Sequence, residues 1–162
     1  MKIPNVNIFL TFLFIGFHYC FSQSCGIKNL NHSEKIELTN FYESFKASII
    51  SSDKSSLSKL IQFPFNCDYC ENSRKPYVKV SRKKFDVDYF NIFYDQKLIE
   101  ALNEGENFEN VIVFNEDNSG ICHIELRYVS RESSAQSEGQ QHFFSIEKIK
   151  NKYYITSAWT VP

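Results

Sequence analysis

Residues 142–159 read HFFSIEKIKNKYYITSAW and hold two apolar-rich runs, HFFSIEKI and KYYITSAW, joined at Lys150, Asn151 and Lys152. Apolar residues spaced two apart, together with aromatic and β-branched side chains, are typical of β-strands. A short polar connection between two such runs is typical of a hairpin. We therefore predict that the chain closes with a β-hairpin.

The segment before this hairpin also has strand character. Residues 110–114 (NVIVF) and 120–130 (GICHIELRYVS) are apolar or alternating, and a turn-forming stretch separates them. The second run is expected to place its odd and even residues on opposite faces. One face carries Cys122, Ile124, Leu126 and Tyr128, and the other carries His123, Glu125 and Arg127.

The first half of the chain shows helical spacing instead. Apolar residues recur every two to four positions in residues 33–50, and similar spacing appears in 54–61 and 82–105. Helices followed by a run of strands indicate an α+β fold. We expect N-terminal helices packed on one face of a strongly curved antiparallel sheet.

The extreme N-terminus has the pattern of a secretory signal. Lys2 precedes a largely apolar run, residues 8–21, which is shorter than the roughly 20 residues of a membrane-spanning helix. We predict that residues 1–24 are a signal peptide and that residues 25–162 form one domain, exported to the periplasm or the medium. No later segment is apolar enough to span a membrane.

The cleavage position leaves an alternative for the first mature residue. Small residues allow a cut before Cys25 or before Gln23. A cut before Cys25 also permits a lipid anchor on that cysteine. Ser22 disfavours lipidation, because bacterial lipoprotein signals usually have an aliphatic residue there.

Charge and composition exclude some functions. The chain has 18 basic and 19 acidic residues, so its net charge is −1. This balance gives no general affinity for nucleic acid. We identify no cofactor motif and no complete set of metal ligands.

Cys67 and Cys70 form the most distinctive local motif. A redox site would need a helix beginning at Cys67, but the following residues lack helical periodicity and soon reach Pro76. A zinc site would need further ligands such as Cys122 and His123, which lie on opposite faces of a predicted strand. We favour a Cys67–Cys70 disulfide, with a longer bridge from either residue to Cys25 or Cys122 as the alternative.

Four segments together resemble the NTF2-like superfamily, and most closely its secreted bacterial members of unknown function. They are residues 41–53 (FYESFKASIISSD), 60–65 (LIQFPF), 81–93 (SRKKFDVDYFNIF) and 143–159 (FFSIEKIKNKYYITSAW). The resemblance implies a cone in which a bent antiparallel sheet wraps around helices and encloses a pocket. The superfamily includes isomerases, dehydratases, transport factors and binding modules, so the resemblance implies no single activity.

We expect non-catalytic binding of a small apolar ligand or of a protein partner. The alternative is an isomerase- or dehydratase-like enzyme that uses a carboxylate or histidine in the cone. The candidate cavity residues are His123, Asp86 and Tyr89. His142 could likewise lie either in the cone or on an ordinary strand surface. No catalytic set is identifiable, and His123 is also explained as part of an ordinary strand surface. The resemblance further implies a possible homodimer through the open face of the sheet.

Overall fold

The computed structural model describes residues 25–68, 70, 78–88, 93–104 and 108–161. The predicted signal peptide, residues 1–24, and the candidate cavity residue Tyr89 lie outside these residues.

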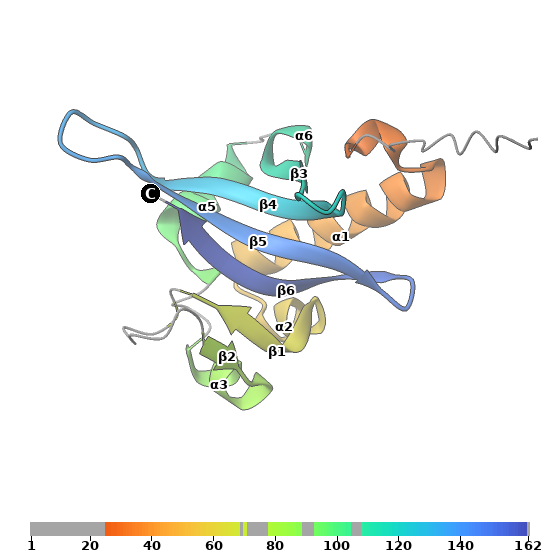
Figure 1. Ribbon diagram of the computed structural model, residues 1–162. Helices are drawn as coiled ribbons and strands as arrows, with labels where there is room; N and C mark the ends of the chain where they lie inside the picture. The colour runs from red at the N-terminus through yellow and green to blue at the C-terminus, as the bar shows by residue number, and fades with distance from the viewer. Residues whose placement is uncertain (1–24, 69, 71–77, 89–92, 105–107, 162) are drawn as a thin grey trace, which may run out of the picture.

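Six strands form one sheet in the order β2-β1-β6-β5-β4-β3 (Figure 1). The strands are β1 (Ile61–Cys67), β2 (Val78–Val80), β3 (Ile112–Glu116), β4 (Cys122–Arg131), β5 (Gln140–Ile149) and β6 (Lys152–Val161). The predicted C-terminal hairpin is present as β5 and β6. Register shifts between Val129 and Arg131 and between Ser145 and Ile146 interrupt the ladders of the long strands. Such irregularities increase the local twist and bend of a sheet.

The sheet is mixed, whereas the sequence predicted an antiparallel one. The other neighbouring strands pair antiparallel, but β1 and β6 run parallel. Alternation with a period of two occurs in both kinds of pairing, so it carries no information about strand direction. The direction of β1 follows instead from α2, which delivers the chain into the sheet.

Helices pack against the sheet, as the α+β prediction required. They are η1 (Ile27–Asn29), α1 (His32–Ile50), α2 (Lys54–Lys59), α3 (Arg82–Asp88), α5 (Gln96–Asn103) and α6 (Phe108–Val111). In Figure 1, α1 and α5 lie behind the strands, and both contact the sheet. Within the described residues, no helix has the length and apolar character needed to cross a bilayer.

The helix predicted over residues 82–105 is interrupted. Tyr94 and Asp95 are not helical, and Asp95 caps α5 by accepting a hydrogen bond from the Lys97 amide at 2.8 Å. An N-cap residue has extended rather than helical backbone angles, so a helix cannot continue through Asp95. The start of the strand predicted at residues 110–114 is also helical, since α6 ends at Val111 and β3 begins at Ile112.

Aromatic rings fill the space between the helices and the sheet. Phe93 stacks on Phe144 of β5 with ring centroids 4.9 Å apart. Its ring also meets Phe45 of α1, Phe65 of β1 and Phe85 of α3 at centroid distances of 6.2, 5.9 and 5.8 Å. All of these rings are fully buried. Phe93 therefore joins elements from every part of the fold.

We expect Phe93→Ala to lower the free energy of unfolding by about 3–5 kcal/mol, because it removes a buried ring and leaves a cavity among four others. Chemical denaturation followed by far-ultraviolet circular dichroism measures this change. Val87→Ala is the control, since Val87 is 73% exposed on α3 and its truncation should change stability by no more than about 0.5 kcal/mol. Similar losses in the two variants would contradict the central role of Phe93.

Candidate functional site

A cleft of about 650 Å³ lies between the N-terminal segment and the sheet. Its apolar lining comes from Leu30, Phe114, Ile121, Ile124, Ile146 and Tyr153. Its polar lining comes from Asn29, Glu34, His123, Glu147 and Lys148, and Cys25, Gly26 and Cys122 complete it. The volume falls in the range of about 300–1,000 Å³ that is typical of small-molecule sites.

Strand register produces the apolar floor of this cleft. Phe114 of β3 pairs with Ile124 of β4, and Ile124 pairs with Ile146 of β5. Directly paired residues point to the same face of a sheet, so the three side chains form a row across neighbouring strands. The alternation in the sequence thus becomes a continuous apolar surface.

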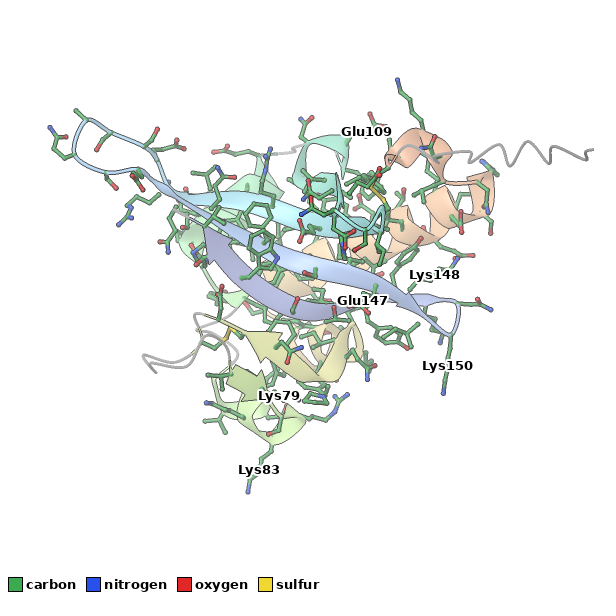
Figure 2. All side chains as sticks on the ribbon, viewed as in Figure 1. Lys79, Lys83, Glu109, Glu147, Lys148 and Lys150 are labelled. Carbon is green, nitrogen blue, oxygen red and sulfur yellow. A yellow bond between two sulfur atoms is a disulfide. The ribbon has the colours of Figure 1, made fainter. Side chains whose placement is uncertain are left out.

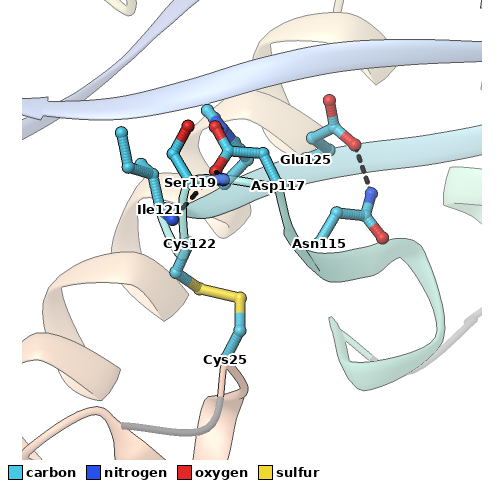
Figure 3. Close-up of polar contacts among 8 residues, drawn as sticks. Cys25, Asn115, Asp117, Ser119, Ile121, Cys122 and Glu125 are labelled. Atoms are coloured by element: carbon cyan, nitrogen blue, oxygen red, sulfur yellow. Dashed lines mark hydrogen bonds and ion pairs between the residues drawn. A yellow bond between two sulfur atoms is a disulfide. The ribbon is translucent and has the colours of Figure 1, made fainter. Parts of the chain in front are cut away.

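A disulfide between Cys25 and Cys122 closes one side of the cleft (Figure 3). It joins residues 97 positions apart, with the Cα atoms 5.3 Å from each other. Cys122 is the first residue of β4, so the bond ties the N-terminal segment to the sheet. A thioether-linked lipid on Cys25 would need the same sulfur atom. The disulfide and the lipid anchor considered from the sequence are therefore mutually exclusive.

The turn between β3 and β4 is fixed by Asp117 (Figure 3). Its Oδ1 accepts hydrogen bonds from the Ser119 and Ile121 amides at 2.8 and 3.0 Å. Its Oδ2 lies 3.1 Å from His123 Nε2. The hydrogen bond from His123, followed by that from the Ile121 amide, lowers the pKa of Asp117. His123, a candidate cavity residue, therefore lines the cleft with its ring held by the turn.

An ionic group also borders the cleft. Lys148, near the end of β5 (Figure 2), places its Nζ 2.7 Å from Glu37 Oε2 and 3.9 Å from Glu34 Oε1. The hydrogen bond with Glu37 is the main cause that raises the pKa of Lys148. Glu34 also belongs to the capping box of α1, in which the Asn31 amide donates to its carboxylate at 3.1 Å. These contacts attach the start of α1 to the sheet without involving the disulfide.

The opposite face of β4 carries a different polar group. Glu125 is buried, and it accepts hydrogen bonds from Trp159 Nε1 at 3.0 Å and from the Asn115 side chain (Figure 3). The Trp159 ring stacks on Phe143 with centroids 4.2 Å apart. Glu125 therefore has a structural role that joins β3, β4 and β6, and it is buried, whereas an ordinary strand surface would leave it in solvent.

A buried hydrogen-bonded network lies further along β4, between α5 and the sheet. Tyr128 Oη donates to Asp95 Oδ2 at 3.0 Å and lies 2.9 Å from His142 Nδ1. Because the single phenolic proton goes to Asp95, His142 donates through Nδ1, and Nε2 is the unprotonated nitrogen. Burial lowers the pKa of His142, while Asp95 and Asp68 act in the opposite direction. A neutral imidazole held in one tautomer is chemically able to accept a proton.

Asp68 and the second disulfide flank this network. Asp68 Oδ2 accepts a hydrogen bond from the Thr160 amide at 3.0 Å, while its buried Oδ1 has no hydrogen-bond partner among the described residues. The structure joins Cys67 to Cys70 with a Cα–Cα distance of 5.5 Å. Cys67 is fully buried and ends a strand, so it lacks the exposure and the helix N-terminus of a reactive thiol.

The sequence located these groups only in part. Asp86, a candidate cavity residue, is exposed on α3. The sequence offers His142 as a candidate site residue, but it does not single out Asp95 or Tyr128. Tyr128 lies on the face of β4 that carries the alternating apolar residues, which indicates a buried phenol, yet its partner Asp95 is 33 residues away.

Among the described residues, no group of three or more histidine, cysteine and acidic side chains is placed to hold a metal ion.

We expect His142 to make stability fall as the solution becomes acidic. In the unfolded chain its pKa returns to about 6.5, whereas burial keeps the native pKa lower. Between these values the unfolded state binds a proton that the native state does not. The contribution of His142 to the free energy of unfolding is therefore complete above about pH 6.5, and it is lost as the pH falls through the native pKa.

The test compares wild type with His142→Asn, whose amide N–H can replace Nδ1 as donor to Tyr128. Wild type should lose more free energy of unfolding between about pH 7.5 and pH 5.5 than the variant does. Urea denaturation at each pH gives the difference. An identical pH dependence in the two proteins would show that His142 does not titrate as its burial requires.

Comparison with known proteins finds a distant structural similarity. No protein-family model matches the chain, and no curated protein matches it. A crystal structure of an NTF2-like protein of unknown function from Shewanella baltica OS155 matches with a TM-score of 0.39 and 10% sequence identity, covering 82% of this chain and 98% of that chain. This chain is thus similar to an NTF2-like protein of unknown function.

Proposed function

We propose that this protein is an exported, non-catalytic binding protein that holds a small, largely apolar molecule in the cleft beside the Cys25–Cys122 disulfide. The observation that carries the proposal is the cleft itself. It has a volume of about 650 Å³ and a floor made by paired apolar residues of three adjacent strands. A fixed apolar surface of this size gains free energy by removing a ligand from water.

The arrangement of the lining suggests how a ligand would lie. An apolar body would cover the row formed by Phe114, Ile124 and Ile146. A polar end would face the side where Glu34 and Lys148 line the cleft. Ile121, which is 57% exposed at the turn, supplies a further apolar contact at the edge. The ligand class is therefore an amphipathic small molecule.

Export is supported by the cysteine pairs and by the N-terminal sequence. Disulfides persist in oxidising compartments, and this structure holds two of them. The apolar run at residues 8–21 has the length of a secretory signal. Together these features favour a protein that works outside the cytosol.

We expect the oxidised protein, residues 25–162, to bind the apolar fluorescent probe N-phenyl-1-naphthylamine. Ile124→Asn should weaken probe binding about tenfold or more, because it leaves an unsatisfied amide in the apolar floor. Ile121→Glu tests the same cleft at an exposed position, where folding is not at risk. Val129→Glu is the matched control, since Val129 is an exposed residue of β4 that lines a different groove.

Fluorescence titration measures these affinities, and native mass spectrometry of the protein purified from an exporting host identifies a carried ligand. The intact mass from the same sample gives the cleavage site. Equal probe affinity in wild type and in both cleft variants would refute the assignment of the cleft. Retention of residues 1–24 would refute export.

A second candidate function is proton transfer at the buried network. The observation that favours it is a neutral histidine held by a tyrosine that is itself held by a carboxylate. Such a group has the parts of a general base with a fixed tautomer. The corresponding reaction would abstract a proton next to a carbonyl group.

The binding proposal predicts that the protein does not catalyse exchange of the proton next to a carbonyl group with deuterium from the solvent. A panel of enolisable ketones is incubated in deuterated buffer with wild type or with His142→Asn, and deuterium incorporation is followed by nuclear magnetic resonance. Incorporation should equal that of buffer alone in both samples. Faster exchange with wild type that disappears in His142→Asn would instead establish the enzymatic function.

A further inference from the structure

We propose that the oxidation state of the Cys25–Cys122 disulfide controls ligand retention in the cleft, because the bond holds the segment that forms one of its walls. The inference rests on the proposed function of the cleft and assigns its regulation. Oxidised protein keeps the wall closed, and reduction by a dithiol releases the wall and the ligand.

The wall consists of residues that precede α1. Cys25, Gly26, Asn29 and Leu30 all line the cleft and all belong to this short segment. The 3₁₀ turn η1 contains no buried residue, and its backbone hydrogen bonds, from Asn29 to Gly26 and from Leu30 to Ile27, stay within the segment. Leu30 packs against the core as a partly buried side chain. A segment with so little burial depends strongly on its covalent link to β4.

The rest of the cleft does not depend on this bond. The start of α1 is fixed by the Asn31–Glu34 capping box and by the contacts of Lys148 with Glu37 and Glu34. The turn at the other end of the bond is fixed by Asp117. Reduction therefore removes the covalent link between residues 25–30 and β4, while the helix and the sheet remain in place. The disulfide thus acts on one wall and leaves the fold intact.

The bond is open to attack. Cys122 is exposed, and Cys25 is half-buried. A thiolate of the reductant attacks one of these sulfurs, forms a mixed disulfide and expels the other cysteine as a thiolate. The second thiol of the reductant then resolves the mixed disulfide. Two electrons and two protons pass to the protein, so Cys25 and Cys122 end as thiols and the reductant ends as a disulfide.

The test uses the probe N-phenyl-1-naphthylamine and two matched double variants. Cys25→Ser with Cys122→Ser removes the wall link, whereas Cys67→Ser with Cys70→Ser removes a disulfide of similar chemistry away from the cleft. We expect the first pair to weaken probe binding about tenfold, the change that loss of one apolar wall contact produces. The second pair should stay within about twofold of oxidised wild type. Circular dichroism confirms that each variant is folded.

A single variant tests the wall without changing the disulfide. Leu30→Ala in the oxidised protein removes the apolar side chain that the segment presents to the cleft, and it should weaken probe binding by a comparable factor. An unchanged affinity in this variant overturns the inference even if the Cys25 and Cys122 double variant does not fold.

The outcomes separate the two proposals. Oxidised wild type that does not bind the probe would refute the function of the cleft. Binding by oxidised wild type with unchanged affinity in the Cys25 and Cys122 variant, or in Leu30→Ala, would overturn the redox inference and leave the binding function standing. Equal weakening in both double variants would also overturn it, because the effect would then be general to the loss of a disulfide.

Discussion

Packing around Phe93 is the interaction on which the rest of this structure depends. Its ring stacks on Phe144 and meets rings from α1, β1 and α3. Protein interiors are packed as densely as organic crystals, so these rings occupy the space that a bent sheet and its helices would otherwise leave open. The largely apolar cleft lies beside the N-terminal segment, and none of these five rings lines it.

The positions of the two polar groups follow from the same packing. The network of Asp95, Tyr128 and His142 lies where α5 meets β4 and β5, and it satisfies the hydrogen-bonding groups that this contact buries. The ionic contacts of Lys148 instead join α1 to the end of β5. One group is buried and fixes a histidine tautomer, whereas the other is partly exposed and borders a cleft. The pKa of His142 is accordingly lowered by burial, whereas the pKa of Lys148 is raised by its hydrogen bond with Glu37.

The disulfides act on different parts of the chain. Cys67–Cys70 spans three positions at the end of β1, so it restricts the unfolded chain very little. Cys25–Cys122 spans 97 positions and fixes a segment that buries little surface of its own. A long-range bond of this kind substitutes for a hydrophobic contact, and the sequence alone left its pairing open.

Local patterns in the sequence determined the α+β class, the C-terminal hairpin, the first helix and the alternation of β4. These features depend on side-chain periodicity, which is a property of neighbouring residues. Tertiary structure decided the parallel pairing of β1 with β6, the interruption of the long helix at Tyr94 and Asp95, and the meeting of Asp95 with Tyr128. It also placed Cys25 beside Cys122, which sets one wall of the cleft. Periodicity reports which face of an element is buried, but the partner that covers this face is set by the packing of the whole chain, and a single sequence carries no local signal for it.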